Sequence, residues 1–377
     1  MEITNNVKKS IVYFTSFRST PKSKFFNRFK NIFEEMGIKD LANKNNIVGI
    51  KTHFGEGDNT TYVHPYYIRK IIELIKPYGW KVFVTDTNTI YAGQRVNAID
   101  HIELALRHGF SFATLGVPVI IADGIRGNDY CEIEIKNSTF YKKVKVASGI
   151  ANCDALIVVT HLKAHIAAGF GGALKNIGMG CAARPHKFNM HSNLAPKINK
   201  KKCAGCGECI KWCPSGAIKV INQKAQIDPN ICIGCGECIS ACPQKCINLA
   251  WDETAENLQK KFVETAAGVI KSVNSKIFYI NFVNNVTPDC DCISHSDVQI
   301  VPDIGVLFSY DPVAIDKASV DLVNQSEGIK GSALDKNFEK GEDKFKALHP
   351  NVDWNIQLIY AEKIGIGTNN YELRIIN

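Results

Sequence analysis

The sequence predicts an α/β protein with a mainly parallel, doubly wound sheet and an inserted α+β domain that is rich in cysteine. Two observations predict this fold. Short β-branched runs alternate with helical patterns along the first half of the chain, and eight of the 14 cysteines fall between positions 203 and 242. Alternating strands and helices are typical of a parallel sheet covered by helices on both faces. A chain of 377 residues is long enough for one large domain around such an insertion.

The large domain is expected to alternate regularly. Strand-like runs occur at Ile11–Thr15, Ile47–Thr52, Lys81–Thr85, Val117–Ala122 and Ala155–Thr160. Helical periodicity covers Lys24–Met36, Pro65–Lys76 and Arg95–His108. Beyond the cysteines we expect a helix at Ala255–Val273, strands at Lys276–Val283 and Val298–Phe308, and a last helix at Trp354–Lys363. Asp311 followed by Pro312 marks a further helix start. Ser326–Lys346, rich in glycine and lysine, is expected to be a surface excursion.

The cysteine-rich stretch consists of two matching runs, each Cys-x2-Cys-x2-Cys-x3-Cys-Pro. The spacing is that of bacterial ferredoxins with two [4Fe–4S] clusters, in which the fourth cysteine of each run binds the other cluster. One cluster is therefore expected on Cys203, Cys206, Cys209 and Cys242, and the other on Cys232, Cys235, Cys238 and Cys213. The alternatives are structural zinc, which uses other spacings, and disulfides, which need an oxidising compartment.

A ferredoxin-type insertion is expected at residues 196–250. Residues 1–195 and 251–377 would then be the two parts of one α/β domain. Cys246 matches an alanine in the first run and is expected to be a small buried residue, and Cys131 and Cys153 are expected to pack in the core.

Four of the expected strands run into a polar residue that can do chemistry. These candidates for catalysis are His53, Asp86, Asp123 and His161. Ligands of open parallel sheets bind beyond the carboxyl ends of the strands, so we expect the four side chains to converge on one rim. The alternative is that the two aspartates merely cap the turns that follow.

A glycine-rich segment, Gly169–Cys181, follows the last of these strands. Gly171 and Gly172 are expected to expose backbone amides to a cofactor, and Lys175 is expected to bind an anion and to take part in catalysis. The spacing is not that of a Walker loop, and a tight turn that simply needs glycine is the alternative. His161 and His165 would share a face if this stretch were helical.

Cys290 and Cys292 are two residues apart, so they face the same side if the chain is extended there. Together with Cys181 they can supply three thiolates to a third metal or iron–sulfur centre, with one position left open. Free buried cysteines are the alternative.

Charge and composition limit the partners. The formal charge of +8 falls to about +4 when two oxidised clusters with their thiolates are counted. The sequence has no basic stripe with interleaved aromatics, no long apolar run and no signal-peptide core, so neither nucleic acid nor a membrane is expected as a partner. The large number of reduced cysteines favours a cytoplasmic protein of anaerobic metabolism. A redox protein or another electron donor is expected to supply its electrons.

The motifs taken in order resemble the domain-of-unknown-function 362 family, whose members often carry the same ferredoxin insertion. The resemblance rests on His53-Phe-Gly-Glu, Asp86-Thr-Asn-Thr-Ile-Tyr, Asp123-Gly, Gly171-Gly-Ala-Leu-Lys-Asn-Ile-Gly-Met-Gly-Cys, Cys290-Asp-Cys, Asp303-Ile-Gly and Ser309-Tyr-Asp-Pro. It covers nearly the whole chain and implies iron–sulfur binding without an established reaction. A local likeness, His165-x3-Gly169-Phe-x4-Lys175-x4-Gly180, resembles the nickel-pincer lactate racemases, in which a lysine tethers the cofactor.

The sequence as a whole predicts an iron–sulfur oxidoreductase. Two [4Fe–4S] clusters would relay low-potential electrons to the rim of the α/β domain, where a small anionic substrate would be reduced. One alternative is a non-catalytic electron carrier or a module that binds a metallocofactor or cluster. Another is an isomerase with a nickel-pincer cofactor.

Overall fold

The centre of the protein is an eight-stranded sheet in the order β16-β1-β15-β14-β7-β2-β3-β4. It is seen in a computed structural model that describes residues 9–192 and 194–376. The five strands from β14 to β4 are parallel, whereas β15 is antiparallel to both of its neighbours and β16 pairs in parallel with β1. The predicted mainly parallel α/β sheet is therefore confirmed.

The strands follow the β-branched runs of the sequence. They are β1 (Ser10–Ser16), β2 (Ile47–Lys51), β3 (Lys81–Asp86), β4 (Val119–Ile121), β7 (Ala155–His161), β14 (Ile277–Val283), β15 (Gly305–Ser309) and β16 (Tyr371–Ile375). Every residue of β7 and β14 is buried, because these central strands are covered on both faces.

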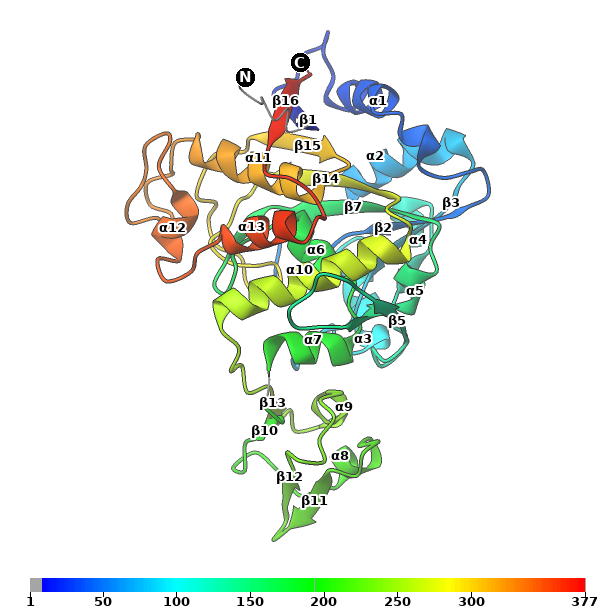
Figure 1. Ribbon diagram of the computed structural model, residues 1–377, viewed down its shortest axis with the longest axis vertical. Coiled ribbons are helices and arrows are strands. Elements are labelled where there is room, and N and C mark those ends of the chain that lie inside the picture. Colours follow the sequence, from blue (N-terminus) through cyan, green and yellow to red (C-terminus); the bar gives the residue numbers. More distant parts are fainter. Residues whose placement is uncertain (1–8, 193, 377) are drawn as a thin grey trace, which may run out of the picture.

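Helices cover both faces of the sheet, and each face has its own hydrophobic core (Figure 1). One core contains α1 (Phe25–Glu35), α2 (Pro65–Ile75) and α3 (Ala98–Arg107). The other contains α6 (Ala173–Gly178), α10 (Ala255–Ser272), α11 (Pro312–Asn324) and α13 (Ile356–Lys363). As predicted, Asp311 caps α11 by accepting hydrogen bonds from the Val313 and Ala314 amides. Within the described ranges, no helix combines the length and the apolarity needed to cross a bilayer.

Three local predictions are wrong or incomplete. The strand expected at Val298–Phe308 begins only at Gly305. The residues before it are not part of the strand and include Pro302, which lacks the N–H that sheet pairing needs. The stretch from His161 to His165 is extended and not helical, since it passes from β7 into β8 (Lys163–His165), which pairs with β9 (Gly169–Gly171). The last strand, β16, was not predicted.

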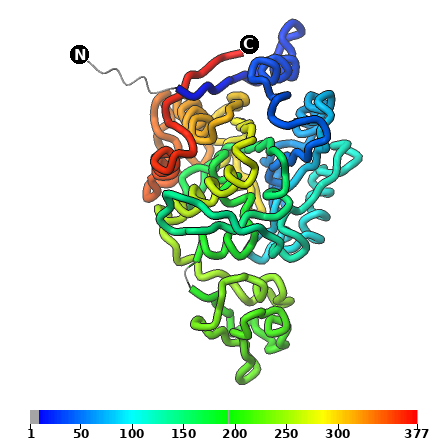
Figure 2. The backbone as a smooth tube through the Cα atoms, turned by 45° about the vertical axis from the view of Figure 1, so that its right-hand side comes forward, coloured from blue at the N-terminus to red at the C-terminus, as the bar shows by residue number. Residues whose placement is uncertain are grey.

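Residues 197–248 form a small lobe below the large sheet, called the cysteine lobe here (Figures 1 and 2). Its elements are β10 (Lys197–Ile198), α8 (Glu208–Lys211), β11 (Ile218–Ile221), β12 (Lys224–Ile227), α9 (Glu237–Ala241) and β13 (Ile247–Asn248). The β10–β13 pair closes the neck of the lobe, and β11 pairs with β12 in a hairpin. The core of the lobe combines thiols with a few aliphatic side chains.

Candidate functional site

A cavity of about 470 Å³ opens at the carboxyl ends of β2, β3 and β7. His53 follows β2, Asp86 ends β3 and His161 ends β7, and all three side chains line the cavity. They meet because the three strands are parallel neighbours. The other predicted residues of this rim that line the cavity are Gly171, Gly172 and Lys175.

Asp123 is not among the residues that line the cavity. Its carboxylate accepts hydrogen bonds from the backbone amide (2.9 Å) and the side-chain amide (2.8 Å) of Asn88, which lies in the loop after β3. Burial raises the pKa of Asp123 to about 6. Asp123 therefore fixes the position of the loop after β3 and does not face the cavity. The prediction that it would join the rim is wrong, because it follows β4, which lies at the edge of the sheet.

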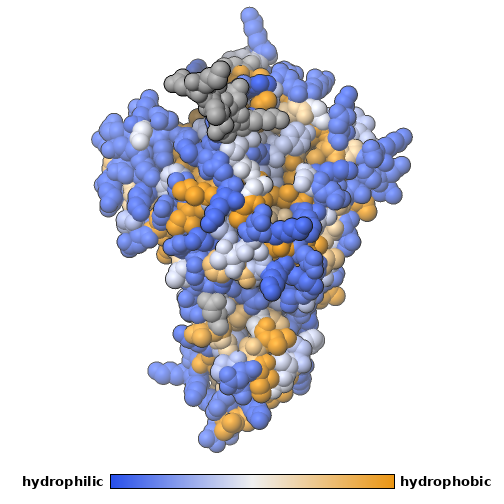
Figure 3. All heavy atoms as spheres, in the orientation of Figure 1, coloured by the Kyte–Doolittle hydropathy of each residue, from blue (hydrophilic) through white to orange (hydrophobic). Residues whose placement is uncertain are grey.

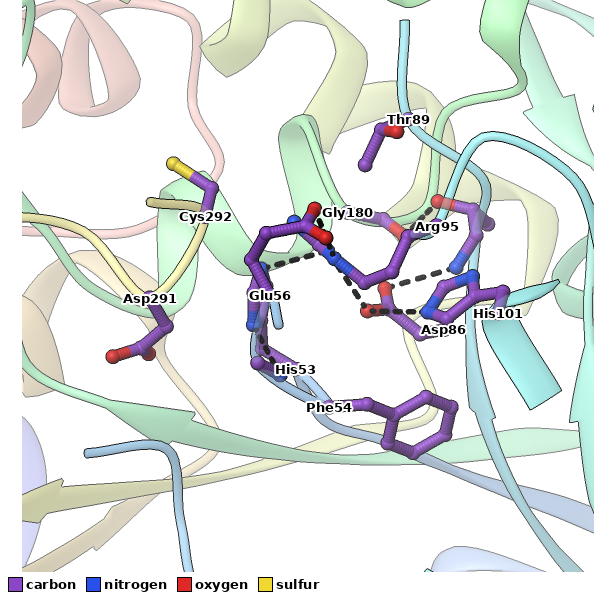
Figure 4. A network of polar contacts seen from close by, with 12 residues as sticks. His53, Phe54, Glu56, Asp86, Thr89, Arg95, His101, Gly180, Asp291 and Cys292 are labelled. Carbon is purple, nitrogen blue, oxygen red and sulfur yellow. Dashed lines mark hydrogen bonds and ion pairs between the residues drawn. The ribbon is translucent and has the colours of Figure 1, made fainter. Parts of the chain in front are cut away.

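Asp86 is the buried anion of a charged network shown in Figure 4. Its carboxylate lies 3.0 Å from the Lys51 ammonium and 3.8 Å from both the Arg95 guanidinium and the His101 ring. Arg95 also pairs with Glu56 at 3.2 Å. Burial opposes the charge of Asp86, but Lys51 and the neighbouring cations hold its pKa well below the usual range. Asp86 is thus fixed as an anion, which suits charge balance and not proton donation.

His53 is held as a neutral ring. The Gly55 amide donates to its Nδ1 at 3.0 Å, and the Arg95 guanidinium faces its Nε2 at 3.0 Å. Burial and the charge of Arg95 keep the pKa of His53 well below its ordinary value. Arg95 also donates to the Tyr91 hydroxyl at 2.5 Å, which in turn donates to the Cys292 carbonyl at 3.1 Å. This network therefore connects the loop after β3 with the two cysteines on the opposite wall.

His161 and Asp291 fix the position of the Cys290–Cys292 loop. The Asp291 carboxylate lies 2.9 Å from His161 Nδ1 and 3.1 Å from the Lys163 ammonium. Although burial opposes it, these two neighbours hold the pKa of Asp291 well below the usual range. His161 Nε2 faces the Asn284 carbonyl at 2.9 Å. With both ring nitrogens engaged, His161 positions the loop and is not a free proton shuttle.

At the start of α6, a carboxylate of the protein itself accepts hydrogen bonds from the backbone amides. The first amides of α6, those of Ala173 and Leu174, donate to the Asp316 carboxylate at 2.6 and 2.9 Å. A Cβ on Gly172 would lie 2.3 Å from the same carboxylate, so glycine is needed there for close approach. The protein itself therefore fills the two amides at the start of α6, while Gly171, Gly172 and the side chain of Lys175 line the cavity.

Lys175 meets a cluster of possible metal ligands. Its ammonium donates to Cys290 Sγ at 3.5 Å. His165, Cys290 and Cys292 each place one ligand atom within 4.8 Å of the others, and all three line the cavity. A hydrogen bond from Cys292 lowers the pKa of Cys290 well below its usual range, and Lys175 and Lys163 add to this effect.

Cys181, the third thiol that the sequence suggested, lies elsewhere. It is fully buried, its carbonyl accepts from the Ala147 amide at 2.9 Å, and burial raises the pKa of its thiol to about 12. The chain turns Cys181 into the core after α6, and His165 takes the place expected for it. The signal for His165 was present in the sequence as the second histidine of the His161–His165 pair.

Lys187 is a cavity residue that the predicted site did not include. Its ammonium donates to Thr87 Oγ1 and to the Asn88 carbonyl, both at 2.6 Å. Burial lowers the pKa of Lys187 to about 8. The sequence signal was the run of basic residues that follows the glycine loop, on α7 (Arg184–His191).

The cysteines of the lobe gather in two groups. Cys203, Cys206, Cys209 and Cys242 line one small cavity. Burial raises the pKa of Cys235, and its neighbours Cys213 and Cys232 add to the effect. Burial also raises the pKa of Cys238, followed in effect by Cys235, Cys232, Cys209 and Cys213. Backbone amides already point at sulfur in both groups, from Ala225 to Cys203 Sγ (3.4 Å) and from Ala217 to Cys213 Sγ (3.2 Å). Cys246 is buried, with its sulfur 3.3 Å from Cys242 Sγ.

The lobe and the cavity share a wall. Ile90 and Tyr91 line the cavity and also pack against the core of the cysteine lobe. Trp251, directly beyond the neck of the lobe, lines the cavity and contacts the His191 ring with a centroid distance of 5.0 Å. Arg184 joins the two parts, since its guanidinium donates to Ser240 Oγ at 2.9 Å and to the Thr89 carbonyl at 3.1 Å.

Comparison with known proteins gives one family and several distant structures, two of which are described here. The profile of a family described as "Domain of unknown function (DUF362)" matches residues 48–321, and no curated protein matches the chain. A lactate racemase apoprotein from Thermoanaerobacterium thermosaccharolyticum is 16% identical with a TM-score of 0.39, over 84% of this chain and 58% of that one. A protein from Thermotoga maritima is 12% identical with a TM-score of 0.38, over 74% of this chain and 55% of the other. The chain thus spans less than two thirds of either protein, and likenesses of this degree carry no functional argument.

Proposed function

The chain belongs to the family described as Domain of unknown function (DUF362), and from this premise we propose that it is an iron–sulfur oxidoreductase. Electrons would pass from two [4Fe–4S] clusters in the cysteine lobe to a small anionic substrate in the 470 Å³ cavity. The observation that carries the proposal is the shared wall, because Ile90 and Tyr91 contact both the thiol-rich core and the cavity.

The thiol groups fit the clusters that the sequence spacing implies. Cys203, Cys206, Cys209 and Cys242 would hold one cluster, and Cys232, Cys235, Cys238 and Cys213 the other. The glycine beside each middle cysteine has a positive φ, for example +68° at Gly205 and +66° at Gly234, which allows the tight turns that such loops need. Amides directed at Cys203 and Cys213 sulfur supply the hydrogen bonds that tune a cluster. When bound, each cluster supplies one electron at a time.

The charges of the cavity favour a small anion. Lys51, Arg95 and Lys163 are each neutralised by a buried carboxylate. Among the described residues, no carboxylate lies within ion-pair distance of Lys175, which faces Cys290 Sγ, or of Lys187, which donates to neutral oxygens, so both cations are open to an anionic ligand. An anionic substrate would supply the missing charge at low cost, because the lysines are already desolvated.

Lys187 is the residue best suited to deliver a proton. Reduction by two electrons consumes two protons, and at least one must come from a group near the substrate. Burial lowers the pKa of Lys187 to about 8, so its ammonium can give up a proton near neutral pH. Asp86 and His53 are poorly suited, since the first is held as an anion and the second as a neutral ring.

The first test is cluster content after anaerobic purification. We expect about eight irons and eight sulfides per chain and a paramagnetic resonance signal on reduction. Cys213→Ser should remove about half of the iron and damage the cluster of Cys232, Cys235 and Cys238, whereas Cys246→Ser should keep all of it. Zinc in place of iron, or nickel with sulfur, would contradict the proposal, and loss of the other cluster would contradict the crossed ligation.

The second test separates the enzyme from a simple carrier. We expect a panel of small carboxylates and inorganic phosphate to include at least one ligand that quenches Trp251 fluorescence saturably. Lys187→Met should weaken that ligand about tenfold or more, while exchange of exposed Lys336 for Met should not. Intact clusters without any saturable anion binding would leave only the electron-carrier alternative.

A further inference from the structure

The group formed by His165, Cys290 and Cys292 has the composition of a catalytic metal site and is separate from the cysteine lobe. One imidazole nitrogen and two sulfurs lie within 4.8 Å of one another. Three protein ligands of the Cys2His type, with a fourth position left for water or substrate, are a known arrangement for catalytic zinc. All three residues line the cavity, so the fourth position faces the space where a substrate would bind.

The spacing of these atoms suits one ion better than a third cluster. Two sulfurs bound to one tetrahedral zinc at about 2.3 Å lie about 3.8 Å apart. The observed separations, none above 4.8 Å, therefore need closure of at most about 1 Å. In a cubic cluster each thiolate binds a different iron, which places its sulfurs further apart than the ligands of one ion.

The surroundings hold the ligands in place. Asp291, between the two cysteines, accepts hydrogen bonds from Thr61 Oγ1 (3.2 Å) and the Lys163 ammonium, and His161 contacts it on the other side. Such contacts behind the ligands are typical of metal sites and govern affinity. Lys175, 3.5 Å from Cys290 Sγ, favours the thiolate that a metal requires.

Ligand binding by His165 has one structural cost. The Ala167 amide donates to its Nδ1 at 3.1 Å. If Nδ1 binds the ion, the metal replaces this amide. If Nε2 binds it, the proton of the neutral ring must move to Nδ1, which can then no longer accept. Either route opens the Ala167 hydrogen bond, so metal loading should leave a trace at that amide.

We propose that His165, Cys290 and Cys292 bind a single thiophilic divalent cation of the zinc type. Two thiolates neutralise the ion, and the charge of Lys175 remains for an anionic ligand in the fourth position. The ion would act as a Lewis acid toward an oxygen of that ligand. The inference does not depend on the clusters of the cysteine lobe.

The experiment measures zinc in the anaerobically purified full chain. We expect one zinc per chain after equilibrium dialysis with zinc chloride, and zinc-edge X-ray absorption should show two sulfur neighbours and one imidazole. Cys290→Ser and His165→Gln should each weaken zinc binding at least a hundredfold. Hydrogen exchange at the Ala167 amide should become faster when zinc is bound.

Cys181→Ser is the matched control, since it removes a buried thiol outside the group and should keep the zinc. Asp291→Asn keeps all three ligands and should weaken zinc about 10–100-fold through loss of loop positioning. Iron content, measured on the same samples, shows separately whether the lobe is loaded. Zinc binding that survives Cys290→Ser, a Cys290–Cys292 disulfide in the isolated chain, or the absence of zinc from the wild type would overturn the inference.

Discussion

At the scale of single residues, burial lowers the pKa of several histidines. His186 is a clear case because it lies outside the cavity, with its Nε2 3.0 Å from Thr265 Oγ1 and its ring against Tyr141. Burial lowers the pKa of His186 from 6.5 to about 3. The folded protein therefore keeps this ring neutral at a pH where the unfolded chain takes up a proton.

This shift predicts acid destabilisation through His186. Between about pH 6.5 and pH 3 only the unfolded state is protonated at this position, so stability falls as the pH falls through that window. From pH 7 to pH 5.5 the residue should account for about 1 kcal/mol of lost unfolding free energy. Chemical denaturation at both pH values is the measurement. His186→Gln should lose this part of the pH dependence and the exposed control His295→Gln should keep it; equal slopes in all three proteins would refute the assignment.

Single residues also show what could be predicted from the sequence. The positions of His53, Asp86 and His161 at the cavity were predicted, because polar residues at the carboxyl ends of neighbouring parallel strands meet at one edge of the sheet. The predictions for Cys181 and Asp123 were wrong because the direction of a side chain after a helix or after an edge strand depends on tertiary packing. Such packing leaves no periodic pattern in the sequence. Arg95 was missed as a site residue, since a buried cation is recognised only with its partners.

At the scale of elements, α6 illustrates a glycine required by close approach. Asp316, on α11, reaches across to accept from the Ala173 and Leu174 amides and from Asn281. Gly172 permits this contact, because a side chain there would overlap the carboxylate. The pattern Gly-Gly predicted a special backbone but could not show whether an external anion or an internal carboxylate fills it.

Gly172→Ala should therefore destabilise the protein. The new Cβ, 2.3 Å from Asp316 Oδ1, must push the carboxylate away from the start of α6, at a cost of about 1–3 kcal/mol. Gly171→Ala is the matched control, because its Cβ would meet no atom closer than 3.4 Å. Thermal and denaturant unfolding should show that Gly172→Ala is less stable than Gly171→Ala. Equal stability would mean that Asp316 does not hold α6 in the way described.

The order of elements was easier to predict than their ends. The first-half strands of the large sheet follow the β-branched runs to within two residues, whereas the hairpin of β5 (Tyr130–Glu134) and β6 (Lys143–Ala147) was not predicted. The sequence before β15 is equally apolar, and only the sheet pairing shows where the strand begins. The exposed strand β16 has no continuous apolar run, and its pairing with β1 links residues more than 300 positions apart.

At the scale of the whole molecule, Arg184 connects the large domain with the cysteine lobe. This fully buried side chain contacts the Val96 and Thr89 carbonyls on one side and Ser240 of the lobe on the other. Elsewhere the lobe presents several exposed apolar side chains, visible as orange atoms in Figure 3. The exposed aliphatic residues of the lobe include Ile210, Ile221 and Ile233. Arg184 is thus a polar link that acts together with the packing of Ile90 and Tyr91 on the lobe and with the Arg126 guanidinium over the Trp212 ring.

Arg184→Met should loosen both sides of this connection. It leaves the Thr89 and Val96 carbonyls without their donor, at about 1–3 kcal/mol for each buried group. Amide hydrogen exchange should become faster both in the loop after β3 and in α9. Ser240→Ala removes only the contact on the lobe and should affect α9 alone. If Ser240→Ala loosened the β3 loop as well, the two sides would not be independent.

The thiol-rich core of the cysteine lobe has a consequence for the life of the protein in the cell. Its interior is built around Cys203, Cys209 and Cys238, and the neck is closed by only the short β10–β13 pair. If the lobe carries the proposed clusters, a chain made while iron is scarce would lack the bonds that tie these sulfurs together. Its lobe would then be more open to proteases than the large sheet, because only its aliphatic side chains and the short β10–β13 pair would hold it closed. Iron supply would then set the lifetime of the protein as well as its activity.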